Sequence, residues 1–96
     1  MGINEFKQGL SKIREAKSIT GILYHSIYVK DLHIFFKRPQ SNKYEKIKID
    51  ELYNLYVNVP NINTVAAKEY ITSRVQSPAV AIILKLKEND KSFSMV

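Results

Sequence analysis

The chain opens with apolar residues spaced three or four positions apart, which is the spacing of one helix face. They are Ile3, Phe6, Leu10 and Ile13. The rest of the wheel is polar and basic, and Asn4 can cap the first turn. This pattern predicts a helix over residues 4–17. Gly9 lies inside it, at a cost of about 1 kcal/mol relative to alanine.

From Thr20 to Pro39 the sequence is rich in β-branched and aromatic residues, which is typical of a β-hairpin. Lys30-Asp31 lies where a two-residue turn fits. Because side chains alternate along a strand, this turn sorts the hairpin into two faces. The predicted core face is Leu23, His25, Ile27, Val29, Leu32, Ile34 and Phe36. The predicted solvent face is Tyr24, Ser26, Tyr28, His33, Phe35 and Lys37.

A third antiparallel strand is expected after a polar loop at 39–43. The segment from Tyr44 to Ile49 alternates again, and it places Tyr44, Lys46 and Lys48 outward and two isoleucines inward. The three strands form a β-meander whose outer face is aromatic and basic.

The second half of the chain has helical signals. Asp50 can cap a short helix that Pro60 ends, and Asn63 can cap another. Ser77-Pro78 is typical of a helix start and opens a segment from Ala79 to about Glu88. That segment also contains β-branched residues, so a strand is the alternative, but a helix is favoured. The predicted fold is a single α+β domain over residues 1–96. It has an N-terminal helix, a three-stranded antiparallel β-meander and two or three short helices on one face of the sheet.

Positive charge is concentrated in the first half of this chain. The net charge is +6, and ten of the 15 Lys and Arg residues lie in residues 1–48, against four of the nine Asp and Glu residues. Residues 49–96 are balanced. The excess is therefore a local basic patch, and a patch of this kind bears on binding partners rather than on fold.

The outer face of the predicted meander combines that charge with aromatic rings. Rings can stack on bases, and lysines can neutralise phosphates, which together suit single-stranded nucleic acid or RNA. The candidate stacking groups are Tyr24, Tyr28, Phe35 and Tyr44. The candidate phosphate partners are Lys37, Arg38, Lys43, Lys46 and Lys48. The same face could instead dock an acidic protein, because Tyr, Phe and Arg are also enriched at protein interfaces.

Two further hypotheses have less support. The helical half resembles the spacing of a helix-turn-helix, with Arg74, Gln76 and Ser77 at the start of the third helix, but that helix is apolar nearly all round. A metal-free ribonuclease would need an acid, a base and cations on one face. The residues that could supply them are His33, Tyr28, Lys37 and Lys46.

No motif in the sequence indicates an enzyme, a cofactor or a metal site. There is no cysteine and no glycine-rich phosphate loop, and His25 and His33 are expected on opposite faces of the hairpin. The longest apolar run is far shorter than a membrane span, and the N-terminal segment has no signal-peptide core. The expectation is a cytoplasmic protein without a membrane segment.

Overall fold

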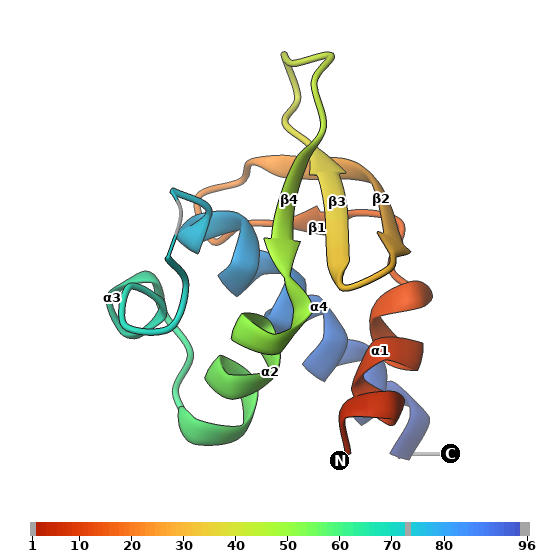
Figure 1. Ribbon diagram of the computed structural model, residues 1–96, viewed down its shortest axis with the longest axis vertical. Coiled ribbons are helices and arrows are strands. Elements are labelled where there is room, and N and C mark those ends of the chain that lie inside the picture. Colours follow the sequence, from red (N-terminus) through yellow and green to blue (C-terminus); the bar gives the residue numbers. More distant parts are fainter. Residues whose placement is uncertain (1, 73, 95–96) are drawn as a thin grey trace.

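The computed structural model describes residues 2–72 and 74–94, and it consists of one antiparallel sheet with helices packed against one of its faces (Figure 1). The strands lie in the order β1-β2-β3-β4. The elements in chain order are α1 (Ile3–Ser11), β1 (Ala16–Lys17), β2 (Leu23–Lys30), β3 (His33–Lys37), β4 (Glu45–Lys48), α2 (Ile49–Asn58), α3 (Thr64–Ala67) and α4 (Gln76–Ser94). The predicted α+β class is confirmed, with four strands in place of three.

The additional strand lies in a segment that was expected to be helical. α1 ends at Ser11, six residues before the predicted end, and β1 pairs with the start of β2. The carbonyl of Arg14 accepts a hydrogen bond from the amide of Ile27 at 3.1 Å. Hydrogen bonds to the sheet therefore replace those of a longer helix, while Ile13 stays buried as its apolar character requires.

The hairpin turn lies one residue later than predicted. Asp31 and Leu32 occupy it, and Asp31 has a φ of 56°. Aspartate tolerates this left-handed conformation better than lysine does. Each β2 residue therefore faces a partner two positions from the predicted one, so Tyr28 lies opposite Phe35. Because a shift of two positions keeps the same side of a strand, the predicted faces survive along this part of the hairpin.

A β-bulge in β2 changes the faces nearer its start. The register shifts between His25 and Tyr28, and Ser26 within this gap has a φ of 55°. The side chain of Tyr24 points into the core with 0% exposure, and His25 lies opposite Lys37 on the outer face. The predicted outward position of Tyr24 and the predicted inward position of His25 are therefore wrong.

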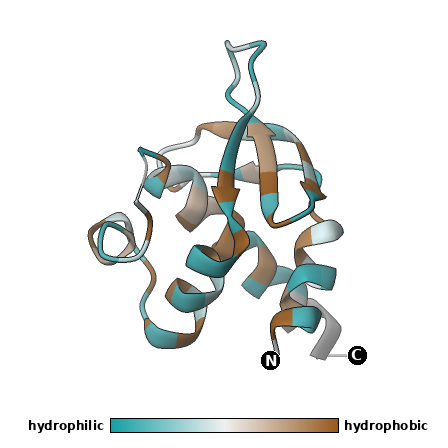
Figure 2. Ribbon diagram, viewed as in Figure 1, coloured by the Kyte–Doolittle hydropathy of each residue, from teal (hydrophilic) through white to brown (hydrophobic). Residues whose placement is uncertain are grey.

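Two other residues assigned to the core face are exposed. Leu23 precedes the bulge and lies opposite Lys17 on β1, and Leu32 is in the turn with 59% exposure. The remaining assignments to that face hold, since Ile27, Ile34 and Phe36 are buried and the half-buried Val29 packs against the core. Figure 2 shows the resulting arrangement, with hydrophobic segments on the strands and on the parts of the helices that pack together.

α4 is the central helix of the core. Its first three turns include Val80, Ala81, Ile82 and Ile83, each at most 3% exposed. The predicted helix over 79–88 is confirmed, and the strand alternative is not observed. This burial leaves those turns without a polar face that could enter a DNA groove, as a helix-turn-helix would require.

The two other helices of the second half also form. Asn63 caps α3 as expected, because its Oδ1 accepts a hydrogen bond from the amide of Ala66 at 2.9 Å. α2 begins one residue earlier than the predicted cap, so Asp50 lies in its first turn rather than at the cap position. A carboxylate in the first turn still interacts favourably with the helix dipole.

Candidate nucleic-acid interface

On the face of the sheet opposite the helices, nine residues of β2, β3, β4 and the position just before β4 lie in three rows. The strand register and ring contacts define the rows as Lys30–His33–Lys48, Tyr28–Phe35–Lys46 and His25–Lys37–Tyr44. We call these nine residues the outer face. Directly paired residues lie on the same side of a sheet, about 5 Å apart, so each row is a set of neighbours.

Three aromatic rings form a cluster at the centre of the outer face. Tyr28 and Phe35 are stacked, with ring centroids 4.9 Å apart and an interplanar angle of 8°. Tyr44 stands nearly perpendicular to both, at 5.2 Å from Tyr28 and 6.4 Å from Phe35. Tyr28 is 37% exposed and Tyr44 is 46% exposed, so the cluster is open to solvent despite its internal contacts.

Cations surround this cluster, and none of the nine outer-face residues is acidic. Lys30, Lys46 and Lys48 are exposed, and the Nζ of Lys37 lies 4.6 Å from the ring centroid of Tyr44. This cation–π contact occupies one side of that ring. The other three lysines are available to a ligand. Glu45 is the acidic residue of β4, and it lies opposite the buried Phe36, so its side chain is on the inner side of the sheet.

Arg38 does not lie on the outer face. It donates from Nε and Nη2 to the two carboxylate oxygens of Glu45, with the second bond at 3.2 Å, and its guanidinium lies 5.9 Å from the ring of Tyr24. The hydrogen bond to Glu45 raises the pKa of Arg38 above its ordinary value. Arg38 is therefore already paired with a carboxylate, at the base of the β3–β4 loop.

Tyr24 also lies outside the candidate site, because its side chain is buried in the core. Its ring packs edge-on against Phe36 at 5.6 Å, and its hydroxyl donates to Oγ of Ser77 at 3.4 Å. Lys43 is exposed in the loop between β3 and β4, which projects from the body at the end opposite α1 (Figure 1). Of the nine predicted site residues, six lie together on the outer face: Tyr28, Phe35, Lys37, Tyr44, Lys46 and Lys48.

Sequence reasoning missed Lys30, which forms the end of the first row. The sequence predicts Lys30 in the turn. Because the turn lies one residue later in the structure, Lys30 is the last residue of β2 and lies opposite His33. The preference of aspartate over lysine for a positive φ was the available signal. His25 was missed because a serine at a bulge carries no sequence signature as strong as glycine.

The two histidines lie on the same face, contrary to prediction, but in the first and third rows. His25 shares a hydrogen bond with the Oγ of Ser26 at 2.9 Å, and the ring of His33 lies 6.2 Å from that of Phe35. Among the residues that the structure describes, no group of three or more His, Asp or Glu side chains could hold a metal ion. No helix in the described part of the chain is long and apolar enough to span a bilayer.

Comparisons with protein-family models, with curated proteins and with solved structures find no match for this chain. The chemistry of the outer face is therefore interpreted from its own geometry.

Proposed function

We propose that this protein binds single-stranded nucleic acid, either RNA or single-stranded DNA, on the outer face. The observation that carries the proposal is a solvent-open cluster of three rings, bordered by four lysines, with no carboxylate among the nine outer-face residues. The rings match the flat, apolar bases of such a ligand, and the lysines match its anionic phosphates.

The rings supply stacking surfaces at the centre of the face. Tyr28 and Phe35 cover one face of each other, so bases stack on the sides of the cluster that remain open, including the exposed part of Tyr44. Base–aromatic stacking contributes about 1–3 kcal/mol per base in proteins of this kind. Stacking of this type requires unpaired bases, which favours a single strand over a duplex.

The lysines supply the phosphate contacts. Lys46 and Lys48 lie two positions apart on the edge strand β4, about 7 Å along the strand, and Lys30 extends the row on the other side of His33. Neutralised phosphates release counterions, so binding that depends on these lysines weakens as salt rises.

Fluorescence anisotropy with labelled single-stranded oligonucleotides tests the proposal at low salt. The matched pair of variants is Tyr44→Ala, which removes a ring, and Tyr44→Phe, which keeps it. We expect Tyr44→Phe to bind like the natural protein and Tyr44→Ala to bind about 5- to 150-fold more weakly, the equivalent of one stacked base. Absence of binding at low salt, or equal affinity of the two variants, would refute the proposal.

A pull-down from lysate with and without nuclease separates this function from docking of an acidic protein. We expect the captured material to be lost after nuclease treatment. A protein partner that persists after nuclease, and is lost with Lys46→Glu, would instead assign the outer face to protein recognition.

A further inference from the structure

β1 is an edge strand of the sheet, and its one neighbouring strand is β2. Backbone groups on alternate residues of a strand point to opposite sides. The carbonyl of Arg14 and the amide of Ser18 bond to β2, at 3.1 and 2.8 Å, and Ala16 lies opposite Tyr24. The peptide groups of Glu15 and Lys17 therefore point away from β2, toward the edge.

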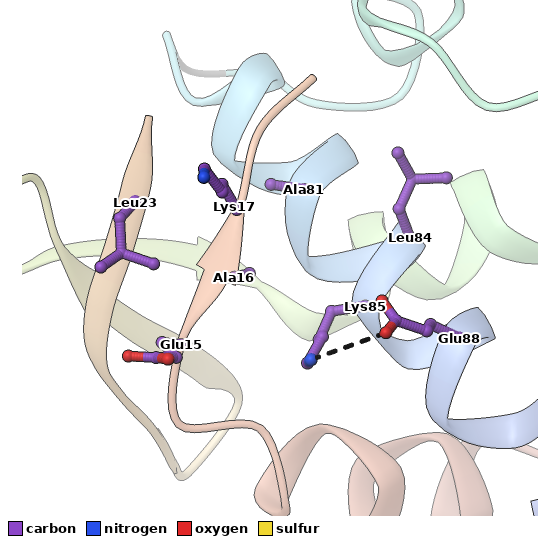
Figure 3. A pocket seen from close by; sticks show the side chains of 8 residues that line it. All are labelled: Glu15, Ala16, Lys17, Leu23, Ala81, Leu84, Lys85 and Glu88. Carbon is purple, nitrogen blue, oxygen red and sulfur yellow. Dashed lines mark ion pairs between the residues drawn. The ribbon is translucent and has the colours of Figure 1, made fainter. Parts of the chain in front are cut away.

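α4 lies beside this edge without filling the space next to it. A half-open cavity of about 220 Å³ separates β1 from Ala81, Leu84 and Lys85 on α4 (Figure 3). The side chains of Glu15 and Lys17 extend from β1 on the side away from α4, and both are exposed. The peptide groups of Glu15 and Lys17 therefore border this half-open cavity beside α4.

We propose that a second copy of this chain pairs with β1 through its own β1, in antiparallel orientation about a two-fold axis at Ala16. In this register Glu15 of each copy lies opposite Lys17 of the other, and Ala16 lies opposite Ala16. The outward peptide groups of Glu15 and Lys17 then form four hydrogen bonds across the axis. A two-fold interface must be self-complementary, and the spacing of one acidic and one basic residue around a small central residue meets that condition.

β4, at the other edge of the sheet, has a different pattern of charges. β4 carries Lys46 and Lys48 around Ile47, so the equivalent pairing of two β4 strands would place lysine against lysine. Like charges on an edge strand prevent pairing between copies. The contrast between the edges indicates that pairing is blocked at β4 and permitted at β1.

The proposed dimer has one continuous sheet of eight strands. A two-fold axis normal to the sheet keeps both outer faces on the same side. Five strand spacings separate the two β3 strands, which is about 24 Å. The pairing holds whether or not the outer face binds nucleic acid, but if it does, one ligand strand can contact two sites and gain affinity from their linkage.

Sedimentation over a range of concentrations tests the proposal with charge-reversal variants. The natural protein is expected to dimerise. Glu15→Lys and Lys17→Glu each place like charges opposite one another, and each should raise the dissociation constant about tenfold or more. A mixture of the two variants should restore dimerisation as a heterodimer, because each opposed pair is then Lys against Glu.

Glu69→Lys is the control for net charge, since Glu69 is exposed outside the sheet and the substitution makes the same change as Glu15→Lys. It should dimerise like the natural protein, and circular dichroism confirms that all variants fold. A natural protein that stays monomeric at high concentration would overturn the proposal. So would a dimer that is insensitive to Glu15→Lys, or a mixture of the two variants that remains monomeric.

Discussion

The salt dependence of binding gives the most quantitative test of the outer face. Four lysines on this face and its adjoining loop have exposed side chains: Lys30, Lys43, Lys46 and Lys48. For a single strand, the logarithm of the binding constant falls with the logarithm of salt concentration at about 0.7 per neutralised phosphate, so four contacts give a slope of about −2.8. Affinity should then fall about 50-fold between about 50 and 200 mM salt.

Substitution of Lys46 and Lys48 together by glutamine removes two of those contacts. The slope should change to about −1.4, and the loss of affinity over the same salt range should shrink to about 7-fold. Both side chains are exposed and neither has a cation–π role, so the fold should not change. Anisotropy titrations at several salt concentrations measure the slope directly.

Lys12 and Lys68 provide the matched control, because both are exposed and occupy the C-cap positions of α1 and α3. The double glutamine variant at these positions carries the same net charge as the Lys46 and Lys48 variant. It should keep the slope of about −2.8. If the two double variants have the same slope, the binding depends on overall charge and not on the outer face.

Three further predictions concern the stability of the fold. Gly9→Ala should destabilise the fold by about 1–3 kcal/mol in urea denaturation, because the added Cβ would lie 2.5 Å from Cδ1 of the buried Leu86. This cost should exceed the gain from the higher helix propensity of alanine. In a Leu86→Ala background the same substitution should stabilise the fold. Arg38→Gln should cost about 1 kcal/mol or less, since the ion pair with Glu45 is about one-third exposed, and it should leave the salt slope of binding unchanged. Ser26→Gly should raise the melting temperature, because glycine adopts a φ of 55° without strain, and a lower melting temperature would show that the serine hydroxyl contributes more than the strain costs.

Much of the fold could be predicted because its elements have consistent local patterns. The buried stripe of α1, the cap of α3 and the apolar start of α4 all have the spacing that the sequence indicates. The end of α1 could not be predicted in this way, because Ile13 and Ala16 are buried in the extended segment just as they would be on a helix. Periodicity over so few residues does not distinguish the two conformations. The hydrogen bonds to β2 decide between them, and these are tertiary.

The candidate site could be predicted where the strands are regular. Tyr28, Phe35 and the outward residues of β4 follow simple alternation, so they lie together as expected. The pairing of Arg38 could not be predicted, because its partner Glu45 is seven residues away across the β3–β4 loop and their contact depends on the strand register. A count of charges along a sequence does not separate cations that are free from those that are already paired.

The bulge at Ser26 explains why Tyr24 is not on the predicted outward side, and it also explains how β2 contributes to the outer face. In a regular strand, Tyr24 and Tyr28 would lie on the same side, and one of the two would be misplaced. The bulge turns Tyr24 into the core, where it packs against Phe36, and leaves Tyr28 outside against Phe35. Deletion of Ser26 should therefore unfold the protein or expose Tyr24, whereas insertion of a residue into the loop at 39–43 should be tolerated. If the deletion variant keeps both its stability and the proposed affinity for single strands, the bulge is not needed for β2 to contribute to the core and to the outer face.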